Sequence, residues 1–203
     1  VTVIEKDNFE LCEQLASLVV EQGNPMFDSR ENCNAIIVTA TDTLVHGCNG
    51  STIPDSIEVI ADYAFSQRRN LSSISIPDSV VYIGEFAFLG CYSLESEIKL
   101  QGIRQVSRSC FDGCSSLKKV TIGSCIESVK SGAFASCSML SDVVITEGAK
   151  YIGTYAFDGC NSLASIALPK SIERIESSAF DRCNRIERVV IPQGTTDYFM
   201  RFD

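Results

Sequence analysis

Ten cysteines and a single histidine are the residues of this 203-residue chain whose chemistry could support metal binding or nucleophilic catalysis. Structural zinc sites usually draw on local C-x-x-C pairs, and the sequence contains none. Cys33, His46 and Cys48 could approach one another as a three-ligand metal site, although a histidine in a polar hairpin is more simply a solvated side chain. A Ser-His-Asp arrangement would need the same histidine, and no phosphate-binding glycine loop is present. We therefore expect a protein that is not an enzyme and has no metal or cofactor.

A disulfide bridge is a second chemical alternative for two of the cysteines. The segment AIIVTATDTLVHG consists of two β-rich runs about a polar tip, which predicts a β-hairpin. Cys33 and Cys48 flank this hairpin symmetrically and could face each other across its strands. A disulfide needs Cα atoms within about 7 Å, so a register slip of one residue would remove the pairing. The sequence leaves both alternatives open, a bridge and two free thiols.

The charge and hydropathy of the chain exclude several classes of partner. The net charge is −9, the pI is about 4.7, and there is no run of Lys or Arg. Nucleic acids and anionic membranes both reward clustered positive charge, so we expect neither as a partner. No apolar stretch approaches the roughly 18 residues of a transmembrane helix, which argues against direct membrane insertion. The opening VTVIEKDNFE is not a signal peptide, and export is left open because processing would give the same start.

Most of the cysteines belong to an internal repeat with a period of 23 residues. A Phe recurs six times at this spacing, and a Cys follows three residues later in every unit except the first, where Arg68 stands. A Leu or Ile follows each Phe after six residues. Cysteines locked to a repeat behave as small buried hydrophobic groups, so we expect a ladder of free thiols beside stacked rings. The residues of this ladder are Phe65, Phe88, Phe111, Phe134, Phe157, Phe180, Cys91, Cys114, Cys137, Cys160 and Cys183.

A fixed period of this length is typical of a solenoid, in which each coil buries its inner face against its neighbours. The last third of the unit reads L-x-x-I-x-I, as in Leu71, Ile74 and Ile76, and this alternation predicts one short strand per coil. Successive strands should run in the same direction and form a parallel sheet with a rise of about 4.8 Å per coil. The Ala-Phe-x-x-Cys segment predicts a short helical or 3-10 turn on the opposite, convex side, with its Phe pointing inward.

Two irregularities interrupt the repeat. Ile98 falls one residue late after Leu94, and the following stretch is one residue short, which predicts a local bulge within a continuous array. The last residues lack the Ala-Phe-x-x-Cys pattern, and we expect Thr196–Phe202 to form a short capping helix over the last open coil. The whole chain, residues 1–203, is thus predicted to be one solenoid domain. Its parts are a partial N-terminal repeat (1–20), a hairpin insertion or degenerate coil (21–52), six regular repeats (53–191) and a C-terminal cap (192–203).

The unit I-P-x-S-[IV]-x-x-I-x-x-x-A-F-x-x-C-x-x-L resembles the BspA-type (Treponema pallidum-like) class of leucine-rich repeats. The resemblance is strong over residues 53–191 and extends to the hairpin insertion and to the IPQGTTDYF ending. It implies a leucine-rich-repeat solenoid from a secreted or surface-attached bacterial protein, with roles in adhesion, and it supplies no catalytic residues. The chain departs from common repeats where those carry Asn, so the turn must satisfy its backbone in another way. The residues at this position are Ser79, Cys125, Gly148, Ser171 and Gly194.

Solenoids bind partners on the extended surface that their outward strand residues form. These positions change from small and hydroxylic to mixed charge along the chain, and an apolar stripe runs through Val144, Ala167 and Val190. An inert face with β-favouring residues is the alternative interpretation. Few aromatic residues occur at these positions, which argues against a platform for stacking sugars. The candidate ligand-binding residues are Lys119, Thr121, Asp142, Val144, Ala167, Arg188 and Val190.

The sequence therefore favours a non-enzymatic module that binds a host or neighbouring-cell protein or glycan through the face of its parallel sheet. The alternative is a structural spacer that displays another domain of a larger surface protein and has no ligand of its own. An extracellular or cell-surface location follows from the resemblance alone, since free cysteines are more typical of reducing compartments.

Overall fold

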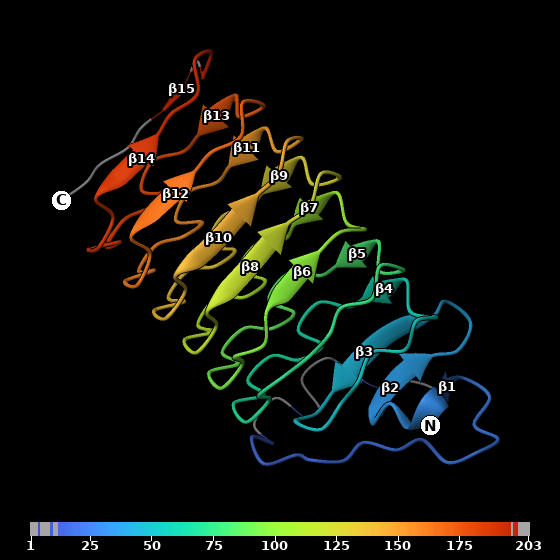
Figure 1. Cartoon of the computed structure of the whole chain (residues 1–203). Coiled ribbons are helices and arrows are strands. Elements are labelled where there is room, and N and C mark those ends of the chain that lie inside the picture. Colours follow the sequence, from blue (N-terminus) through green and yellow to red (C-terminus); the bar gives the residue numbers. More distant parts are fainter. Residues whose placement is uncertain (1–3, 5–8, 10–11, 196, 199–203) are drawn as a thin grey trace.

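The computed structural model describes residues 4, 9, 12–195 and 197–198, and it consists of coils stacked side by side along one axis (Figure 1). Successive coils hydrogen-bond to one another through three five-stranded sheets. The N-terminal sheet has the order β1-β2-β3-β4-β5, and a 3-10 helix at Arg30–Asn32 precedes β2. Its strands are β1 (Phe27–Asp28), β2 (Ala35–Val38), β3 (Thr43–Gly47), β4 (Val59–Ile60) and β5 (Tyr82–Ile83).

The main sheet is the parallel sheet predicted from the L-x-x-I-x-I pattern. Its order is β14-β12-β10-β8-β6, so each coil adds one strand beside the last. Val143 pairs with Val120 at the full period, whereas Ile98 pairs with Val120 at a separation one residue shorter. Inward residues along each strand are buried and outward ones are exposed or half-exposed, as in the strand that ends at Ile145. The strands are β6 (Ile98–Leu100), β8 (Lys119–Ile122), β10 (Asp142–Ile145), β12 (Ser165–Ala167) and β14 (Arg188–Val190).

A second parallel sheet adds a strand that the sequence did not indicate. We expected one strand per coil, but each coil also pairs two residues just after its I-P-x-S turn. These pairs are too short to show an alternation of polar and apolar residues. They recur with the repeat, and β4 and β5 occupy the same place in their own coils. The strands are β7 (Gln105–Val106), β9 (Ser128–Val129), β11 (Tyr151–Ile152), β13 (Arg174–Ile175) and β15 (Asp197–Tyr198).

A stack of phenylalanine rings runs through the core on the convex side. Adjacent rings lie 4.9–5.5 Å apart between centroids and within 12° of parallel. Because this spacing exceeds face-to-face contact, the rings are offset, an arrangement that aromatic pairs favour. The spacing also matches the rise between neighbouring strands, so ring stacking and sheet pairing impose the same distance between coils. Six rings take part: Phe65, Phe88, Phe111, Phe134, Phe157 and Phe180.

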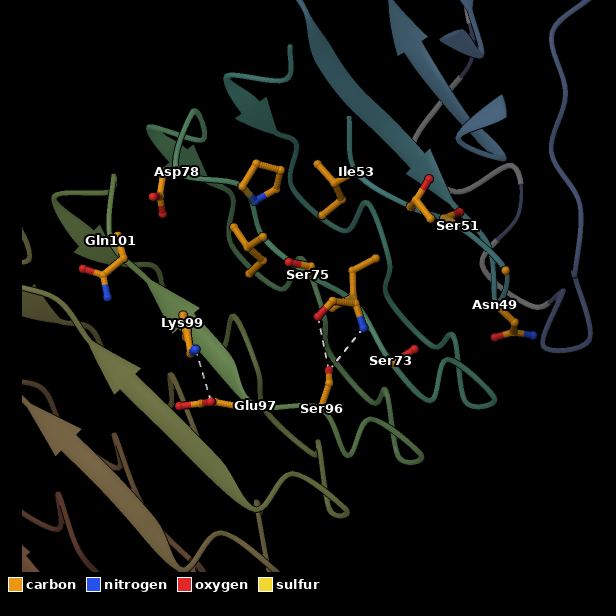
Figure 2. Close-up of a pocket in the computed structure, with 15 residues that line it drawn as sticks. Asn49, Ser51, Ile53, Ser73, Ser75, Asp78, Ser96, Glu97, Lys99 and Gln101 are labelled. Atoms are coloured by element: carbon orange, nitrogen blue, oxygen red, sulfur yellow. Dashed lines mark hydrogen bonds and ion pairs between the residues drawn. The ribbon is translucent and has the colours of Figure 1, made fainter. Parts of the chain in front are cut away.

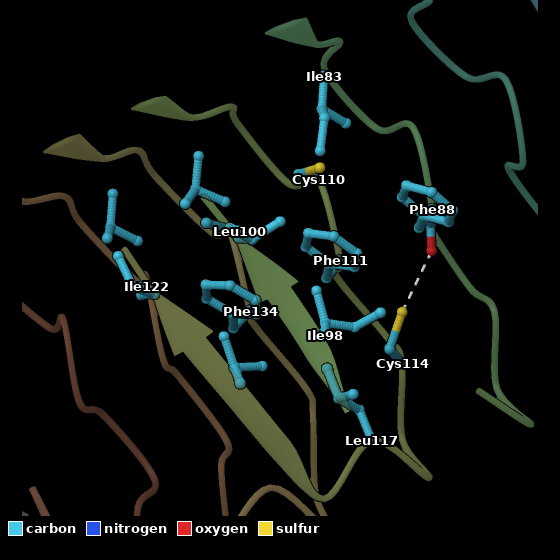
Figure 3. Packing of buried hydrophobic residues seen from close by; sticks show 14 of the residues in the cluster. Ile83, Phe88, Ile98, Leu100, Cys110, Phe111, Cys114, Leu117, Ile122 and Phe134 are labelled. Carbon is cyan, nitrogen blue, oxygen red and sulfur yellow. Dashed lines mark hydrogen bonds between the residues drawn. The ribbon is translucent and has the colours of Figure 1, made fainter. Parts of the chain in front are cut away.

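The cysteine that follows each Phe completes the bonding of the Phe carbonyl. The Phe88 carbonyl accepts the Cys91 N–H within its own coil and the Cys114 thiol of the next coil, at 3.3 Å in each case (Figure 3). A carbonyl oxygen has two lone pairs, so both are used. The same thiol bond recurs through the array at 3.1–3.3 Å. Burial raises the pKa of the Cys114 and Cys137 thiols, which keeps these groups protonated as donors.

The convex segment forms isolated hydrogen-bonded turns, as short as the helical or 3-10 turn that the sequence predicted, and none of them is part of a helix. Bonds from residue i+3 to residue i are present, as in Arg68 N–H to the Phe65 carbonyl at 3.1 Å. Backbone φ is positive two residues before and two residues after each Phe, for example 58° at Phe86 and 68° at Gly90. Left-handed residues at both places prevent a helix from propagating. Alternate N–H groups instead donate to the next coil, as Phe88 does to the Cys110 carbonyl at 2.8 Å.

Serine hydroxyls provide part of the turn bonding that Asn provides in common repeats. The Ser79 hydroxyl donates to the Ile57 carbonyl at 2.9 Å. The Ser171 hydroxyl donates to the Ala149 carbonyl at 2.7 Å and accepts the Gly148 N–H at 2.9 Å. At these turns the hydroxyl therefore bonds to the backbone of the preceding coil.

Of the two alternatives that the sequence left open for Cys33 and Cys48, the structure has the two free thiols. Ala35 pairs with Gly47 in the antiparallel hairpin, so the two cysteines are offset by one residue across the strands. Both thiols are free and buried, and they point into different cores. Cys33 joins the core of the solenoid, whereas Cys48 joins a smaller cluster with Leu18, Phe27 and Ile36.

Two side chains near the N-terminus differ in burial from the expectation. His46 is buried, not solvated, and its ring packs edge-on against Phe9 at 5.2 Å. Cys12 is exposed, although its spacing after Phe9 matches the buried ladder cysteines. The turn bonds of the repeat are nevertheless present, from Cys12 N–H to the Phe9 carbonyl and from Leu15 N–H to the Cys12 carbonyl, each at 3.0 Å. The segment from Phe9 to Leu15 therefore has the same backbone turns as a regular coil, but Phe9 and Leu15 pack against the smaller N-terminal cluster and not in the core of the solenoid.

The expected capping helix at Thr196–Phe202 falls largely outside the described residues. Within that range the structure describes Asp197–Tyr198, which form β15 and pair in parallel with β13. These two residues therefore extend the second sheet by one further strand and are not helical.

We predict that Phe111→Ala lowers the free energy of unfolding by about 3–5 kcal/mol, because it removes a fully buried ring from the stack and leaves a cavity. Urea unfolding followed by circular dichroism measures the effect. Tyr155→Ala is the matched control. It also removes an aromatic ring, which differs from that of Phe by one hydroxyl group, but Tyr155 is 48% exposed. An equal decrease in the free energy of unfolding for both variants would contradict a stabilising role of the ring stack.

We predict that two thiols of the native protein, Cys12 and Cys125, react rapidly with an aromatic disulfide reagent, because they are the exposed cysteines of the described chain. The other eight are buried and should react only after denaturation. All ten should be counted in denaturant without reductant. A smaller total would reveal a disulfide, and rapid reaction of ladder thiols would contradict their burial.

Candidate binding surface

The outward face of the main sheet brings the predicted binding residues onto one surface. Strand pairing sets Lys119 beside Asp142 and Thr121 beside Val144, and it continues from Val144 to Ala167 and from Ala167 to Val190. Buried residues such as Val120 and Val143 alternate with them on the inner side. Two parallel rows result, one mainly charged and one mainly apolar. The residues are Lys119, Asp142 and Arg188 in the first row, and Thr121, Val144, Ala167 and Val190 in the second.

The N-terminal end of this face is an ordered cluster of alternating charges. The Lys119 ammonium lies 3.1 Å from Asp142 and 3.7 Å from Glu97. Glu97 also accepts the Thr121 hydroxyl at 3.2 Å and lies 3.5 Å from Lys99. The hydrogen bond and charge of Asp142, together with the charge of Glu97, raise the pKa of Lys119. Exposed ion pairs of this kind contribute little to the stability of the fold.

Sequence reasoning missed Glu97 and Lys99 because the extra residue before Ile98 shifts the strand against the repeat count. Counting from each Phe places other residues on the face of this coil, whereas the observed register sets Lys99 beside Thr121. The signal that could have found them is the pairing of opposite charges about one period apart, as in Glu95 and Lys118, which lie 3.2 Å apart.

The C-terminal end of the face is apolar. Val144 and Val190 are 41% and 49% exposed, and Ala167 between them is exposed as well. Exposed branched residues favour a strand conformation, but Thr would do so equally well without presenting apolar surface to water. Val144, Ala167 and Val190 thus place adjacent apolar side chains on the outward side of three neighbouring strands.

The side chains that could bind a metal ion are scattered over the described part of the chain. No group of three or more His, Cys, Asp or Glu side chains there is placed to hold a metal ion. This includes Cys33, His46 and Cys48, whose proposed convergence is undone by the hairpin register. Within the same residues, no helix has the length and hydropathy needed to cross a membrane.

Comparison with protein-family models shows to which family the repeat array belongs. The model for the BspA type leucine-rich repeat region matches residues 46–146 and 127–200, with six copies. The chain belongs to the BspA-type leucine-rich repeat family. This confirms the resemblance drawn from the I-P-x-S and A-F-x-x-C motifs, and the solenoid fold that it implied. Curated proteins give no match.

Solved structures of bacterial leucine-rich repeat proteins share the fold. A leucine-rich repeat protein from Eubacterium ventriosum is 26% identical with a TM-score of 0.65, and the match covers 84% of this chain and 53% of that one. A leucine rich cell surface protein from Faecalibacterium prausnitzii is 26% identical with a TM-score of 0.59, covering 86% and 42%. The leucine-rich repeat protein of T. pallidum, 22% identical with a TM-score of 0.51, shares the fold over 86% of this chain and 72% of its own. The chain thus spans about half the length of the first two structures.

Proposed function

We propose that this member of the BspA-type family is a non-enzymatic binding module that recognises a protein partner through the outward face of its main sheet. The observation that carries the proposal is the apolar row formed by Val144, Ala167 and Val190, which is exposed although it adds nothing to the core. Ordered charges around Lys119 flank this row. An apolar centre bordered by charged groups is the usual composition of a protein-binding patch.

A protein partner fits this face better than a glycan does. The seven candidate residues include no aromatic side chain on which a sugar ring could stack. The partner would be a host or neighbouring-cell protein, and the location would be extracellular or at the cell surface. The location is supported by one structural relative that is described as a cell surface protein.

The alternative is a spacer that displays another part of a larger protein. The observation that favours it is the regularity of the array, whose inward residues are fixed by the repeat. A spacer needs a stable stack and no particular outward row. The two functions therefore make opposite predictions for substitutions on the face of the main sheet.

We predict that the double variant Val144→Asp with Val190→Asp weakens binding to the recognised protein by about tenfold or more, because it places carboxylates in an apolar contact. Panels of immobilised extracellular-matrix proteins and of glycans identify the target, and titration against it measures the loss. Unfolding should change little, since both side chains are exposed.

Val81→Asp is the control for that experiment, because Val81 is 54% exposed and lies outside the main sheet. Equal weakening by Val81→Asp would place the contact elsewhere. If the protein binds neither the matrix proteins nor the glycans, the spacer function is favoured. If it binds glycans alone, the proposal of a protein partner is wrong.

A further inference from the structure

The outward side of the second sheet carries a cavity that extends across three of its strands, β7, β9 and β11 (Figure 1). Gln105 pairs with Ser128, and Ser128 pairs with Tyr151, so these three side chains stand in one row across the sheet. Their neighbours Val106 and Val129 are buried on the inner side. The cavity over this row has a volume of about 430 Å³, which lies within the roughly 300–1,000 Å³ of typical ligand sites.

A gap in two rows of aromatic side chains makes room for this cavity. In both rows the same two coils carry a residue without a ring, whereas the coils on either side carry an aromatic residue at that place in the repeat. Along the strands the residues are Tyr82, Gln105, Ser128 and Tyr151, and two residues before each stacked Phe they are Phe86, Ser109, Gly132 and Tyr155. The space that two rings per coil would fill is therefore open at these coils.

Two cations border the cavity, and each is held against an aromatic ring. The Arg108 guanidinium lies over the Phe86 ring, 5.6 Å from its centroid, and the Lys130 ammonium lies 5.7 Å from the centroid of the Tyr151 ring. A cation is attracted to the face of such a ring, so these contacts help to hold the two side chains in place. Among the described residues, neither cation has an ion-pair partner. Both charges are therefore available to an anionic group.

The charge of the lining favours a ligand with one anionic group over a polyanion. Glu85 is the one carboxylate in the lining, so Arg108, Lys130 and Glu85 together give the cavity a net charge of +1. The chain as a whole has a net charge of −9 and would repel a long polyanion. A carboxylate accepts hydrogen bonds and has none to donate, so Glu85 needs donors such as hydroxyl groups. A ligand that combines one carboxylate with several hydroxyl groups satisfies both kinds of charge.

Three neutral polar side chains of the lining, Gln105, Ser128 and Ser131, form no hydrogen bond with the described part of the chain. Ser171, by contrast, donates to the Ala149 carbonyl of the preceding coil. Hydroxyl and amide groups both donate and accept, which suits the hydroxyl groups of a sugar. Tyr151 adds aromatic surface for the C–H groups of a sugar ring, which the seven candidate residues of the main sheet lack.

A larger cavity, of about 920 Å³, lies beside β6 (Figure 2), and its polar groups are already partly bonded within the chain. It lies where no strand pairing crosses from one coil to the next, so the local bulge expected at Ile98 is an interruption of the sheets. Its one cation, Lys99, is 3.5 Å from Glu97. The Ser96 hydroxyl bonds both the N–H and the carbonyl of Ile74 at 3.2 Å. This cavity therefore lacks the unpaired cations of the cavity on the second sheet.

We propose that the cavity on the second sheet binds a carboxylated sugar, such as a uronic acid residue of a glycan. Arg108 and Lys130 bind the carboxylate, and Glu85 accepts a hydrogen bond from a ring hydroxyl. Gln105, Ser128 and Ser131 bind the remaining hydroxyl groups. The site is separate from the main sheet and does not depend on the protein-binding function proposed for that face.

The probes for the test are methyl glucuronide and methyl galacturonide, with methyl glucoside and methyl galactoside as their neutral counterparts. Nuclear magnetic resonance titration of the isotope-labelled protein measures the affinity and locates the site. The uronides should bind at least about tenfold more tightly than the neutral sugars at low salt, and added salt should weaken them. Shifts should appear at residues of β7, β9 and β11. Equal affinity for acidic and neutral sugars, no binding at all, or shifts confined to the main sheet would overturn the proposal.

A pair of charge variants tests the two cations. Arg108→Gln with Lys130→Gln should weaken the uronides about tenfold or more, because it removes both charges from the lining. Arg104→Gln with Lys150→Gln is the matched control, since it changes the net charge equally at two exposed residues outside the lining. Equal weakening in the two double variants would show a general effect of charge and would contradict a site at the cavity.

A second pair of variants tests the cavity itself with both cations kept. Ser128→Tyr restores the aromatic residue that Tyr82 and Tyr151 provide in other coils, and it should abolish uronide binding by filling the cavity. Ser165→Tyr, at an exposed serine of the main sheet, should leave binding unchanged. Circular dichroism checks that both variants are folded. Unchanged affinity in Ser128→Tyr, or a glutamate-rich peptide that binds the same residues as tightly as the uronides, would overturn the sugar ligand.

Discussion

The hydrogen bonding of the Phe carbonyl is the constraint on which the array depends. One lone pair bonds within the coil and the other accepts the thiol of the next coil, so in the five coils that carry Cys three residues after Phe this side chain is short and carries a donor. Arg68 occupies the place of the ladder cysteine in the first regular coil, next to the N-terminal segment. Its guanidinium donates to the Phe9 carbonyl at 2.6 Å and to the Cys12 carbonyl at 2.8 Å, so a longer side chain makes the bond that a thiol makes elsewhere. The first regular coil is therefore tied to the N-terminal segment by the same rule that ties the coils to one another.

The inward and outward residues of the coils are under different constraints. The inward positions are fixed by ring stacking at 4.9–5.5 Å and by the thiol bonds, and a change there affects every neighbouring coil. Outward positions of the main sheet do not take part in the packing between coils, because pairs such as Lys119 and Asp142 are exposed to solvent. The identity of residues on this face can thus change from coil to coil without a cost to the stack. A surface that varies while the core repeats is the property that binding requires.

Periodicity allowed the sequence to predict the stack and the main sheet but not the parts that break the period. Phe111 and Cys114 were identifiable because their neighbours recur at a constant spacing, whereas Cys33 and Cys48 depend on a hairpin register that one residue decides. His46 is buried because Phe9, far away in sequence, packs against it. The second sheet escaped detection because its strands have two residues each, too few for a pattern. The late position of Ile98 was visible, but its effect on two sheets at once was not, since that effect depends on which segments face each other after a full turn.

The interface at which the N-terminal sheet ends with β5 and the other two sheets begin with β6 and β7 has a consequence for the stability of the array. In a solenoid the total stability is approximately a sum of terms from adjacent coils, so one weak interface limits how far unfolding spreads. This interface keeps the stacking of Phe88 on Phe111 and the backbone bonds of the convex side, but no strand pairs across it in any of the three sheets.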